Sequence, residues 1–184
     1  MKKIFTLAAG FCFLLACNSK PADSTASATD SAKVVADTTT KPVEIADSKY
    51  MDWGKKDLAA LASGDVDSWM NSYADNAVYI WSAGDSLSGK AAIAKYWKDR
   101  RANVIDTISF PTAIFLPIKI NQPQQGPDLK GNWLLGWHLT VVKYKTGKHL
   151  AFWVHVDNHY NSDGKIDRTI EYIDKAPINK ALGK

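Results

Sequence analysis

Two histidines and an aspartate lie close together in one strand-like segment, FWVHVDNHY at residues 152–160. His155, Asp157 and His159 are each separated by a single residue, so on a β-strand all three would share one face. These residue types could bind a metal, transfer protons, or form the polar side of a strand. The neighbouring strands decide among these interpretations.

A metal site is the first possibility, because two histidines and a carboxylate are a ligand set of iron and zinc centres. His155 and His159, however, would lie about 13 Å apart at roughly 3.3 Å per residue, which is too far to share an ion. Only His138, His155 and Asp157 could converge, and Arg168 would compete for the carboxylate. We therefore predict neither a metal nor a cofactor.

Acid–base catalysis is the second possibility. A carboxylate beside an arginine stays ionised, whereas a partly buried histidine titrates near neutral pH and can move a proton. Asp157 could activate a water, with His155 or His138 as the base and Arg168 beside the carboxylate. Isomerisation, dehydration and water addition need no nucleophile, which suits a chain whose two cysteines both lie within the first 17 residues.

Ligand binding without catalysis is the third possibility and the favoured one. In this interpretation Asp157 and Arg168 are a satisfied ion pair, and the central histidines hydrogen-bond to neighbours. His149 and His159 are expected to face solvent. The aromatic side chains would bind a small apolar or amphipathic molecule. The candidate ligand contacts are Trp81, Thr140, Trp153, Ile170 and Tyr172.

The pairing of the strands follows from the turns that connect them. A two-residue turn at Thr146 and Gly147 would place His138 opposite His155. The same register pairs Gly136 with Asp157 and Thr140 with Trp153. A four-residue NSDG loop at 161–164 would then place Asp157 opposite Arg168, and Trp153 opposite Tyr172.

The elements that must hold these strands follow a simple order. Apolar residues recur at helical spacing from residue 47 or 48, SGD at 63–65 interrupts them, and a second helix follows. An early strand, a turn and a third helix come next, and the pattern is β-like from residue 104 onward. Three helices and an early strand before an antiparallel meander predict an α+β domain, with helices covering a curved sheet that closes into a cone.

The N-terminus indicates a bacterial lipoprotein. MKK and the short apolar run after it are typical of a signal peptide, predicted at residues 1–16. LLAC, which ends at Cys17, resembles a lipobox, so we predict a lipid anchor on Cys17. Residues 17–46 are polar and small, and are predicted to be a disordered tether to one domain at 47–180. The expected location is the bacterial cell envelope, on the periplasmic or cell-surface side of a membrane.

The charge distribution argues against a nucleic-acid partner. The formal net charge is +4, and the basic residues are spread among acidic ones. The densest basic run, KYWKDRR at 95–101, is interrupted by aromatic residues and is typical of a solvated helix face. The expected partners are a small-molecule ligand, the membrane through the anchor, and a second copy of the chain.

The order of motifs along the domain resembles a known superfamily. LASGDVDSWMNSYADNAVYIWSAGDSLSGKAAIAKYW at 61–97 and DGKIDRTIEYID at 163–174 resemble the SnoaL-like, nuclear transport factor 2-like superfamily. The resemblance implies a cone-shaped α+β barrel that is often dimeric. Members include isomerases, cyclases, dehydratases and epoxide hydrolases, and also binding and structural domains, so the fold does not name an activity.

The resemblance also suggests which face of the sheet lies inside the cone. The terminal strand of the family points its isoleucine and later aromatic residue inward, which implies that Ile166, Ile170 and Tyr172 are interior. The cluster of His138, His155, Asp157 and Arg168 would then line the cone, although the reverse assignment stays open. The other face is expected to form a dimer. Its residues are Trp137, Leu139, Val141, Phe152, Val154 and Val156.

Overall fold

The helices of the domain begin and end at local signals in the sequence. The computed structural model describes residues 41–122 and 129–184. Helix α1 spans Lys49–Ser63 and α2 spans Val66–Met70. Gly64 ends α1 with a left-handed φ of 84°, and Asp65 caps α2 by accepting a hydrogen bond from the Ser68 amide. Helix α3 spans Lys90–Asn103. The predicted order of three helices is confirmed.

The strands form one curved sheet in the order β1-β4-β5-β6-β7-β2-β3. All neighbouring strands are antiparallel except β2 and β7, which are parallel. The predicted α+β class is confirmed. The strands are β1 Val43–Ile45, β2 Tyr73–Trp81, β3 Ser86–Ser88, β4 Ile105–Ile120, β5 Gly131–Tyr144, β6 His149–Tyr160 and β7 Ile166–Tyr172.

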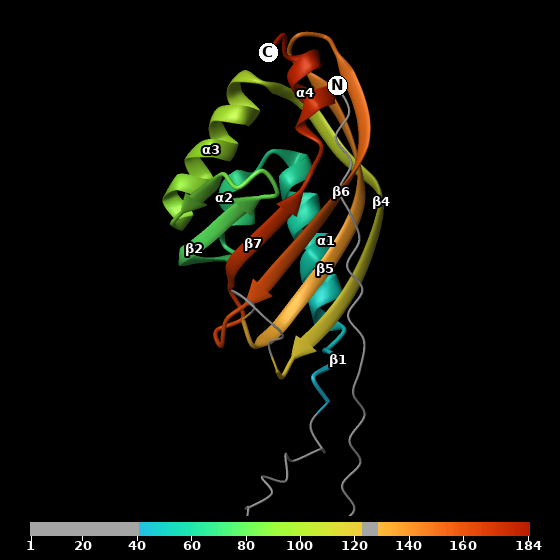
Figure 1. The fold of residues 1–184 in the computed structure, drawn as a ribbon. Helices are drawn as coiled ribbons and strands as arrows, with labels where there is room; N and C mark the ends of the chain where they lie inside the picture. Colours follow the sequence, from blue (N-terminus) through green and yellow to red (C-terminus); the bar gives the residue numbers. More distant parts are fainter. Residues whose placement is uncertain (1–40, 123–128) are drawn as a thin grey trace, which may run out of the picture. The chain divides into compact units, whose positions relative to one another are not determined.

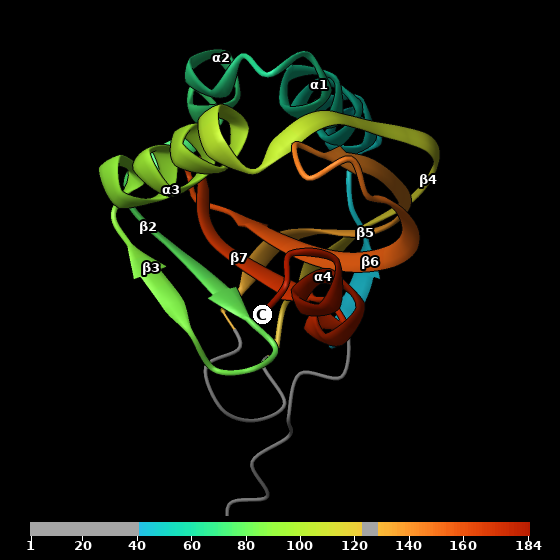
Figure 2. The same cartoon turned by 90° about the horizontal axis from the view of Figure 1, so that it is seen from above.

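Helices α1, α2 and α3 cover the concave face of the sheet, as Figures 1 and 2 show. A short helix that the sequence did not predict, α4 (Lys175–Ala181), follows β7 and contacts β6. The long strand β4 shifts register between Ser109 and Thr112. Pro111 lies in this irregularity, which is where a strand tolerates a residue without an amide hydrogen.

The N-terminal boundary of the fold differs from the prediction. Residues 43–45, predicted to belong to the tether, form β1 and pair with Ile118–Ile120 of β4. All described residues belong to one compact unit, Asp37–Lys184. The proposed signal peptide, Cys17 and most of the tether lie outside the described residues. Within the described ranges, no helix has both the length and the apolar character needed to cross a bilayer.

The pairing of β5 with β6 differs by one residue from the prediction. Trp137 pairs with His155, and His138 pairs with Val154. The reason is the turn, which has three residues rather than two: Lys143 pairs with His149, and Gly147 adopts a φ of 84° before Lys148. Because side chains alternate along a strand, this shift places His138 and His155 on opposite faces.

The pairing of β6 with β7 also differs from the prediction. Asp157 pairs with Ile170, His155 pairs with Tyr172, and Arg168 pairs with His159 rather than with Asp157. The register shifts between His159 and Tyr160, so that Asp167 is an extra residue in β7. Because of this bulge, Ile166 lies on the same face as Thr169 and Glu171, where it is fully buried. Ile170 and Tyr172 lie on the opposite face.

The two faces of the sheet therefore carry different sets of residues from those predicted. The concave face, toward the helices, includes His138, Thr140, Val142, Val154, Val156, Thr169 and Glu171. The outer face, which points away from the helices, includes Ile114, Trp137, Trp153, His155, Asp157, Arg168, Ile170 and Tyr172. The predicted apolar dimer face is divided between the two, because Phe152, Val154 and Val156 line the concave side.

Candidate functional site

A cavity of about 250 Å³ lies between the concave face of the sheet and the helices. Its walls are mainly aromatic and aliphatic, and residues of α4 form part of one end. Such a mixture of apolar wall and a few polar groups is typical of small-molecule sites. The apolar lining includes Trp69, Trp81, Tyr96, Phe110, Phe115, Val142, Phe152, Val154 and Ile178.

The most deeply buried acidic group of the cavity wall is Glu171 on β7. The Tyr79 hydroxyl of β2 donates a hydrogen bond to its carboxyl. Burial raises the pKa of Glu171 above its ordinary value, although the Tyr79 hydrogen bond and the positive charges of Arg100 and Lys175 oppose the shift. Compared with an exposed glutamate, Glu171 is thus better able to remain a neutral acid that can donate a hydrogen bond.

A chain of hydroxyl groups lies next to this pair. The Thr169 hydroxyl donates to Asn158 Oδ1 at 2.7 Å, so the Tyr73 hydroxyl, 3.1 Å from Thr169 Oγ1, is the donor in its own contact. Thr169 is 1% exposed. All three residues line the cavity, and these hydrogen bonds tie β2, β6 and β7 together behind it.

A second carboxyl group enters the cavity wall from α1. Asp57 lies in the buried stripe of that helix, and one of its oxygens accepts a 2.5 Å hydrogen bond from the Ser72 hydroxyl. Its Oδ2 is buried and has no hydrogen-bond partner among the described residues. Burial raises the pKa of Asp57 to about 6, against the opposing effect of the Ser72 hydrogen bond. This carboxyl therefore titrates close to neutral pH.

Strand β5 adds two polar side chains to the cavity wall. His138 is 7% exposed and lies edge-on to Phe110, and burial lowers its pKa to about 4, with a further contribution from the charge of His155. At neutral pH it is thus an uncharged imidazole. Thr140 lies two residues further along, and its hydroxyl is buried without a hydrogen-bond partner in the described part of the chain.

The remaining polar groups of the cavity come from α3 and α4. Trp97 and Arg100 are three residues apart on α3, and both line the cavity. The Trp97 indole nitrogen is buried and has no hydrogen-bond partner in the described ranges. The Arg100 guanidinium lies 5.6 Å from the centre of the Tyr96 ring. Lys175 of α4 lies 5.1 Å from the Trp81 ring and forms an ion pair with Asp85.

The comparisons with known proteins agree on the fold. Residues 57–114 match the family model of the SnoaL-like domain. Residues 57–114 are thus similar to the SnoaL-like family, and the domain, called the SnoaL-like domain below, has the nuclear transport factor 2-like fold. No curated protein matches the chain in sequence.

Solved structures extend the likeness over most of the SnoaL-like domain. A nuclear transport factor 2-like protein of unknown function from Burkholderia pseudomallei K96243 aligns with a TM-score of 0.59 and 10% identity, over 75% of this chain and all of the other. A provisionally named polyketide cyclase from Xanthomonas campestris pv. campestris aligns at 0.57 with 13% identity, over 72% and 95%. A provisionally named isomerase from Bacillus subtilis aligns at 0.55 with 20% identity, over 73% and 93%. At these identities the likeness shows the fold alone.

The structure separates the predicted catalytic residues of the SnoaL-like domain. His138 lines the cavity, whereas His155, Asp157 and Arg168 belong to the outer face. His155 is stacked between Trp137 at 4.6 Å and Tyr172 at 5.3 Å, and its Nε2 lies 3.0 Å from Asp157 Oδ1. The predicted convergence of the two histidines is wrong, and because they lie on opposite sides of the sheet they cannot share a metal ion.

The predicted ligand contacts are divided in the same way. Trp81 and Thr140 line the cavity. Trp153 and Tyr172 are 54% and 46% exposed on the outer face, where Ile170 also lies. These three are therefore wrongly placed by the predicted register, and cannot contact a ligand inside the cone.

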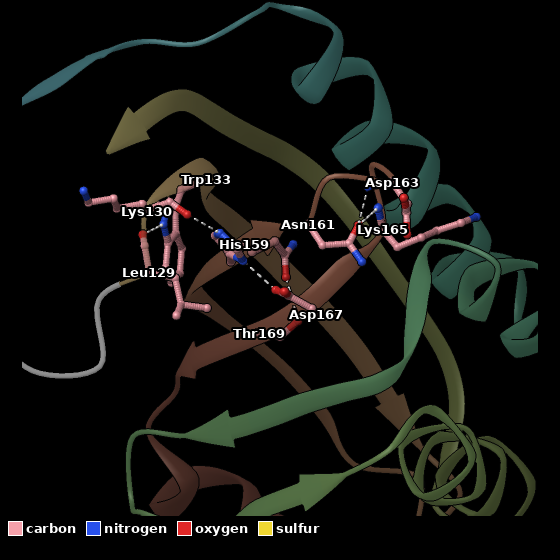
Figure 3. A network of polar contacts seen from close by, with 10 residues as sticks. Leu129, Lys130, Trp133, His159, Asn161, Asp163, Lys165, Asp167 and Thr169 are labelled. Atoms are coloured by element: carbon pink, nitrogen blue, oxygen red, sulfur yellow. Dashed lines mark hydrogen bonds and ion pairs between the residues drawn. The ribbon is translucent and has the colours of Figure 1, made fainter. Parts of the chain in front are cut away.

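His159 is buried rather than solvent-facing, which corrects the prediction for this residue. It is 6% exposed and packs against Trp133. Figure 3 shows its ring between two oxygen atoms: Nδ1 lies 2.5 Å from Asp167 Oδ1, and Nε2 donates to the Lys130 carbonyl at 3.0 Å. The bulge in β7 carries Asp167 to this histidine, and the bond to the Lys130 carbonyl joins β6 to the residue just before β5. His149 is exposed, as predicted.

Sequence reasoning missed the two carboxyl groups of the cavity, although both leave a signal. Asp57 follows Tyr50 and Gly54 and precedes Leu61 at helical spacing, so the pattern places it on the buried stripe of α1. Glu171 is two residues from Thr169 on an alternating strand. The face of that strand depended on a bulge, which the sequence pattern did not reveal.

Proposed function

We propose that the SnoaL-like domain binds a small, mainly apolar molecule in its cone and holds it near a bacterial envelope membrane through a lipid on Cys17. The observation that carries the binding proposal is the cavity of about 250 Å³, whose wall is largely aromatic and aliphatic. The lipobox-like LLAC and the polar segment after it support the anchoring.

The polar groups of the cavity give the ligand an orientation. Asp57, Thr140 and Trp97 each present a buried polar atom that no described residue satisfies. Buried polar atoms are nearly always hydrogen-bonded, so a ligand with matching groups gains specificity by pairing with them. The apolar wall supplies affinity, and these three atoms select among molecules of similar shape.

A neutral aromatic probe tests the binding proposal. We expect 2-naphthylmethanol, titrated calorimetrically into the full chain carrying Cys17→Ala, to bind in the cavity. Val156→Phe narrows the cavity and should weaken binding by about tenfold or more, whereas Ala151→Phe adds the same ring to the outer face of the same strand and should not. Equal binding by the two folded variants, or none by the parent chain, would contradict the proposal.

Acid–base catalysis is a second candidate function, favoured by the position of Asp57. A buried carboxyl that titrates near pH 6 and has an unpaired oxygen in an apolar cavity has the properties of a general base. Asp57 Oδ2 would take a proton from a carbon next to a carbonyl, and the same carboxyl would return it to that carbon or to a neighbouring one. Glu171 is the candidate hydrogen-bond donor to the oxygen of the intermediate.

Hydrogen–deuterium exchange distinguishes this candidate from binding alone. With 2-tetralone in D₂O, the parent chain should accelerate exchange of the acidic C–H groups, and Asp57→Asn should lose this acceleration while its affinity for the ketone changes less than about tenfold. Asp157→Asn is the matched control, because Asp157 is also a partly buried carboxyl with a raised pKa but lies on the outer face. Exchange that survives in Asp57→Asn would exclude Asp57 as the base.

A further inference from the structure

The face of α3 that lines the cavity carries two side chains that can only donate hydrogen bonds. Trp97 and Arg100 lie three residues apart, which places them on one side of the helix. An indole N–H and a guanidinium have no acceptor atom. A ligand group that pairs with both must therefore present acceptors.

Neither of these donors is paired with an acidic residue in the described part of the chain. The Trp97 Nε1 atom is buried without a hydrogen-bond partner among the described residues. Over the same ranges, no carboxylate lies within ion-pair distance of the Arg100 guanidinium. This group contacts the ring and the hydroxyl of Tyr96, and its positive charge acts on the Glu171 carboxyl without a direct ion pair. By contrast, Lys98 on the exposed side of α3 forms an ion pair with Asp67 at 2.6 Å.

The charges around the α4 end of the cavity also favour a negative ligand. Arg100, Lys175 and Lys184 all contribute to the wall. The nearest acidic group in the wall, Glu171, accepts a hydrogen bond from the Tyr79 hydroxyl, and its burial favours its neutral form. Lys175 is engaged by the exposed Asp85, which leaves Arg100 and Lys184 as the cations of this wall without an ion pair among the described residues. Of these two, Arg100 has the planar group that matches a carboxylate.

We infer that the ligand of this cavity is a small carboxylic acid with an apolar body, whose carboxylate is bound by Arg100 and the Trp97 N–H. The inference rests on the proposed binding function and adds the chemical class of the ligand. The carboxylate supplies the two acceptor atoms that the donors require, and an arginine binds that planar group with parallel hydrogen bonds. The apolar body occupies the aromatic part of the cavity.

Three probes of nearly the same shape test the charge of the ligand. We expect 2-naphthoate to bind the full chain carrying Cys17→Ala roughly tenfold to hundredfold more tightly than 2-naphthylmethanol, as a charge-assisted hydrogen bond provides. The cation 2-naphthylmethylammonium should bind most weakly. Binding is measured by calorimetry at pH 7.5, where the naphthoate is fully ionised.

Matched variants assign the effect to the two donors. Arg100→Gln should abolish the preference for naphthoate over the alcohol, and Trp97→Phe, which keeps an aromatic ring, should reduce it. Lys98→Gln removes one positive charge from the same helix outside the cavity and should keep the preference. Each variant must retain the unfolding transition of the parent.

The outcomes separate this inference from the proposed function. If naphthoate and the alcohol bind equally well, or if the ammonium probe binds best, the carboxylate inference is wrong while ligand binding stands. A preference that persists in Arg100→Gln would equally overturn it. If none of the three probes binds, the proposed function fails, and this inference fails with it.

Discussion

The Tyr79 hydroxyl donates a hydrogen bond to the buried carboxyl of Glu171, and the two residues come from neighbouring parallel strands, β2 and β7. This contact links β2, the first strand after α2, to β7, the last strand of the meander. It also places a carboxyl group inside an aromatic cavity, where its burial would otherwise be unfavourable. The pair is thus both a structural link and part of the candidate site.

Removal of the Tyr79 hydroxyl should destabilise the domain. Tyr79→Phe leaves the Glu171 carboxyl without this donor, and we expect a loss of about 1–3 kcal/mol in the free energy of unfolding. Urea denaturation followed by tryptophan fluorescence measures the change. Tyr172→Phe removes a hydroxyl from a tyrosine that is 46% exposed and should have little effect. Equal stability of the two variants would show that the Tyr79–Glu171 hydrogen bond contributes nothing.

Asp57 should make the stability of the domain fall as the pH rises. Its pKa is about 6 in the folded protein against an ordinary value of 3.8, so between these values the folded state holds a proton that the unfolded chain has released. The stabilisation is complete below the unfolded pKa and is lost as the pH passes through about 6. Relative to the parent, Asp57→Asn should gain up to about 3 kcal/mol between pH 4 and pH 7. A constant offset between the two stability curves would contradict this.

His138 should have the opposite effect over much of the same range. Its pKa is about 4 in the folded protein against an ordinary value of 6.5, so the unfolded chain takes up a proton first as the pH falls. Stability is lost from about pH 6.5 down to about pH 4. His138→Phe should remove this loss, which amounts to about 3 kcal/mol at most. The measurement is the difference in the free energy of unfolding between His138→Phe and the parent at each pH, which keeps the titrations of His138 and Asp57 separate. If the variant loses stability in parallel with the parent as the pH falls, the assignment is refuted.

The outer face should mediate association of two copies of the chain. Ile114, Trp137, His155 and Tyr172 are successive partners across β4, β5, β6 and β7, and Ile114 and Trp153 are more than half exposed. Exposed apolar and aromatic side chains gathered on one face are typical of an interface. We expect the Cys17→Ala chain to sediment as a dimer and Ile114→Lys to sediment as a folded monomer. Val154→Asp should instead unfold the domain, since Val154 is 5% exposed on the concave side. A dimer that tolerates Ile114→Lys would rule out this face.

Cys17 should determine whether the protein is found with the membrane. In a bacterial host supplied with radiolabelled palmitate, the parent chain should incorporate the label and sediment with membranes. Cys17→Ala should do neither, because the thiol that carries the lipid is absent. Cys12→Ala lies within the same apolar run and serves as the control, with labelling expected to persist. Unlabelled parent protein would disprove the lipoprotein assignment.

Helix and strand boundaries were largely readable from local sequence. Gly64 and Asp65 separate α1 from α2 because one adopts a left-handed backbone and the other caps the next helix. Pro111 lies at the register shift of β4, a position that a local rule for proline in strands also favours. The order of these signals also led to the correct fold, since each signal depends only on residues that are close together in the sequence.

The composition of the site depended on two details that local patterns do not reveal. A third residue in the turn before Lys148 moved His155 and Asp157 to the outer face, and a bulge at Asp167 moved Thr169 and Glu171 to the inner one. Because side chains alternate with a period of two, each one-residue change exchanges the faces of a whole strand.

The sequence by itself therefore determined the α+β class, the first three helices, the meander and the resemblance to the SnoaL-like family, because those features follow from periodicity and short-range signals. Only the tertiary structure decided that Asp57, Glu171 and Arg100 share a cavity with His138, and that His155 and Asp157 do not. The physical reason is that a cavity is formed by side chains from distant strands and helices. Their convergence depends on register, bulges and burial summed over the whole domain.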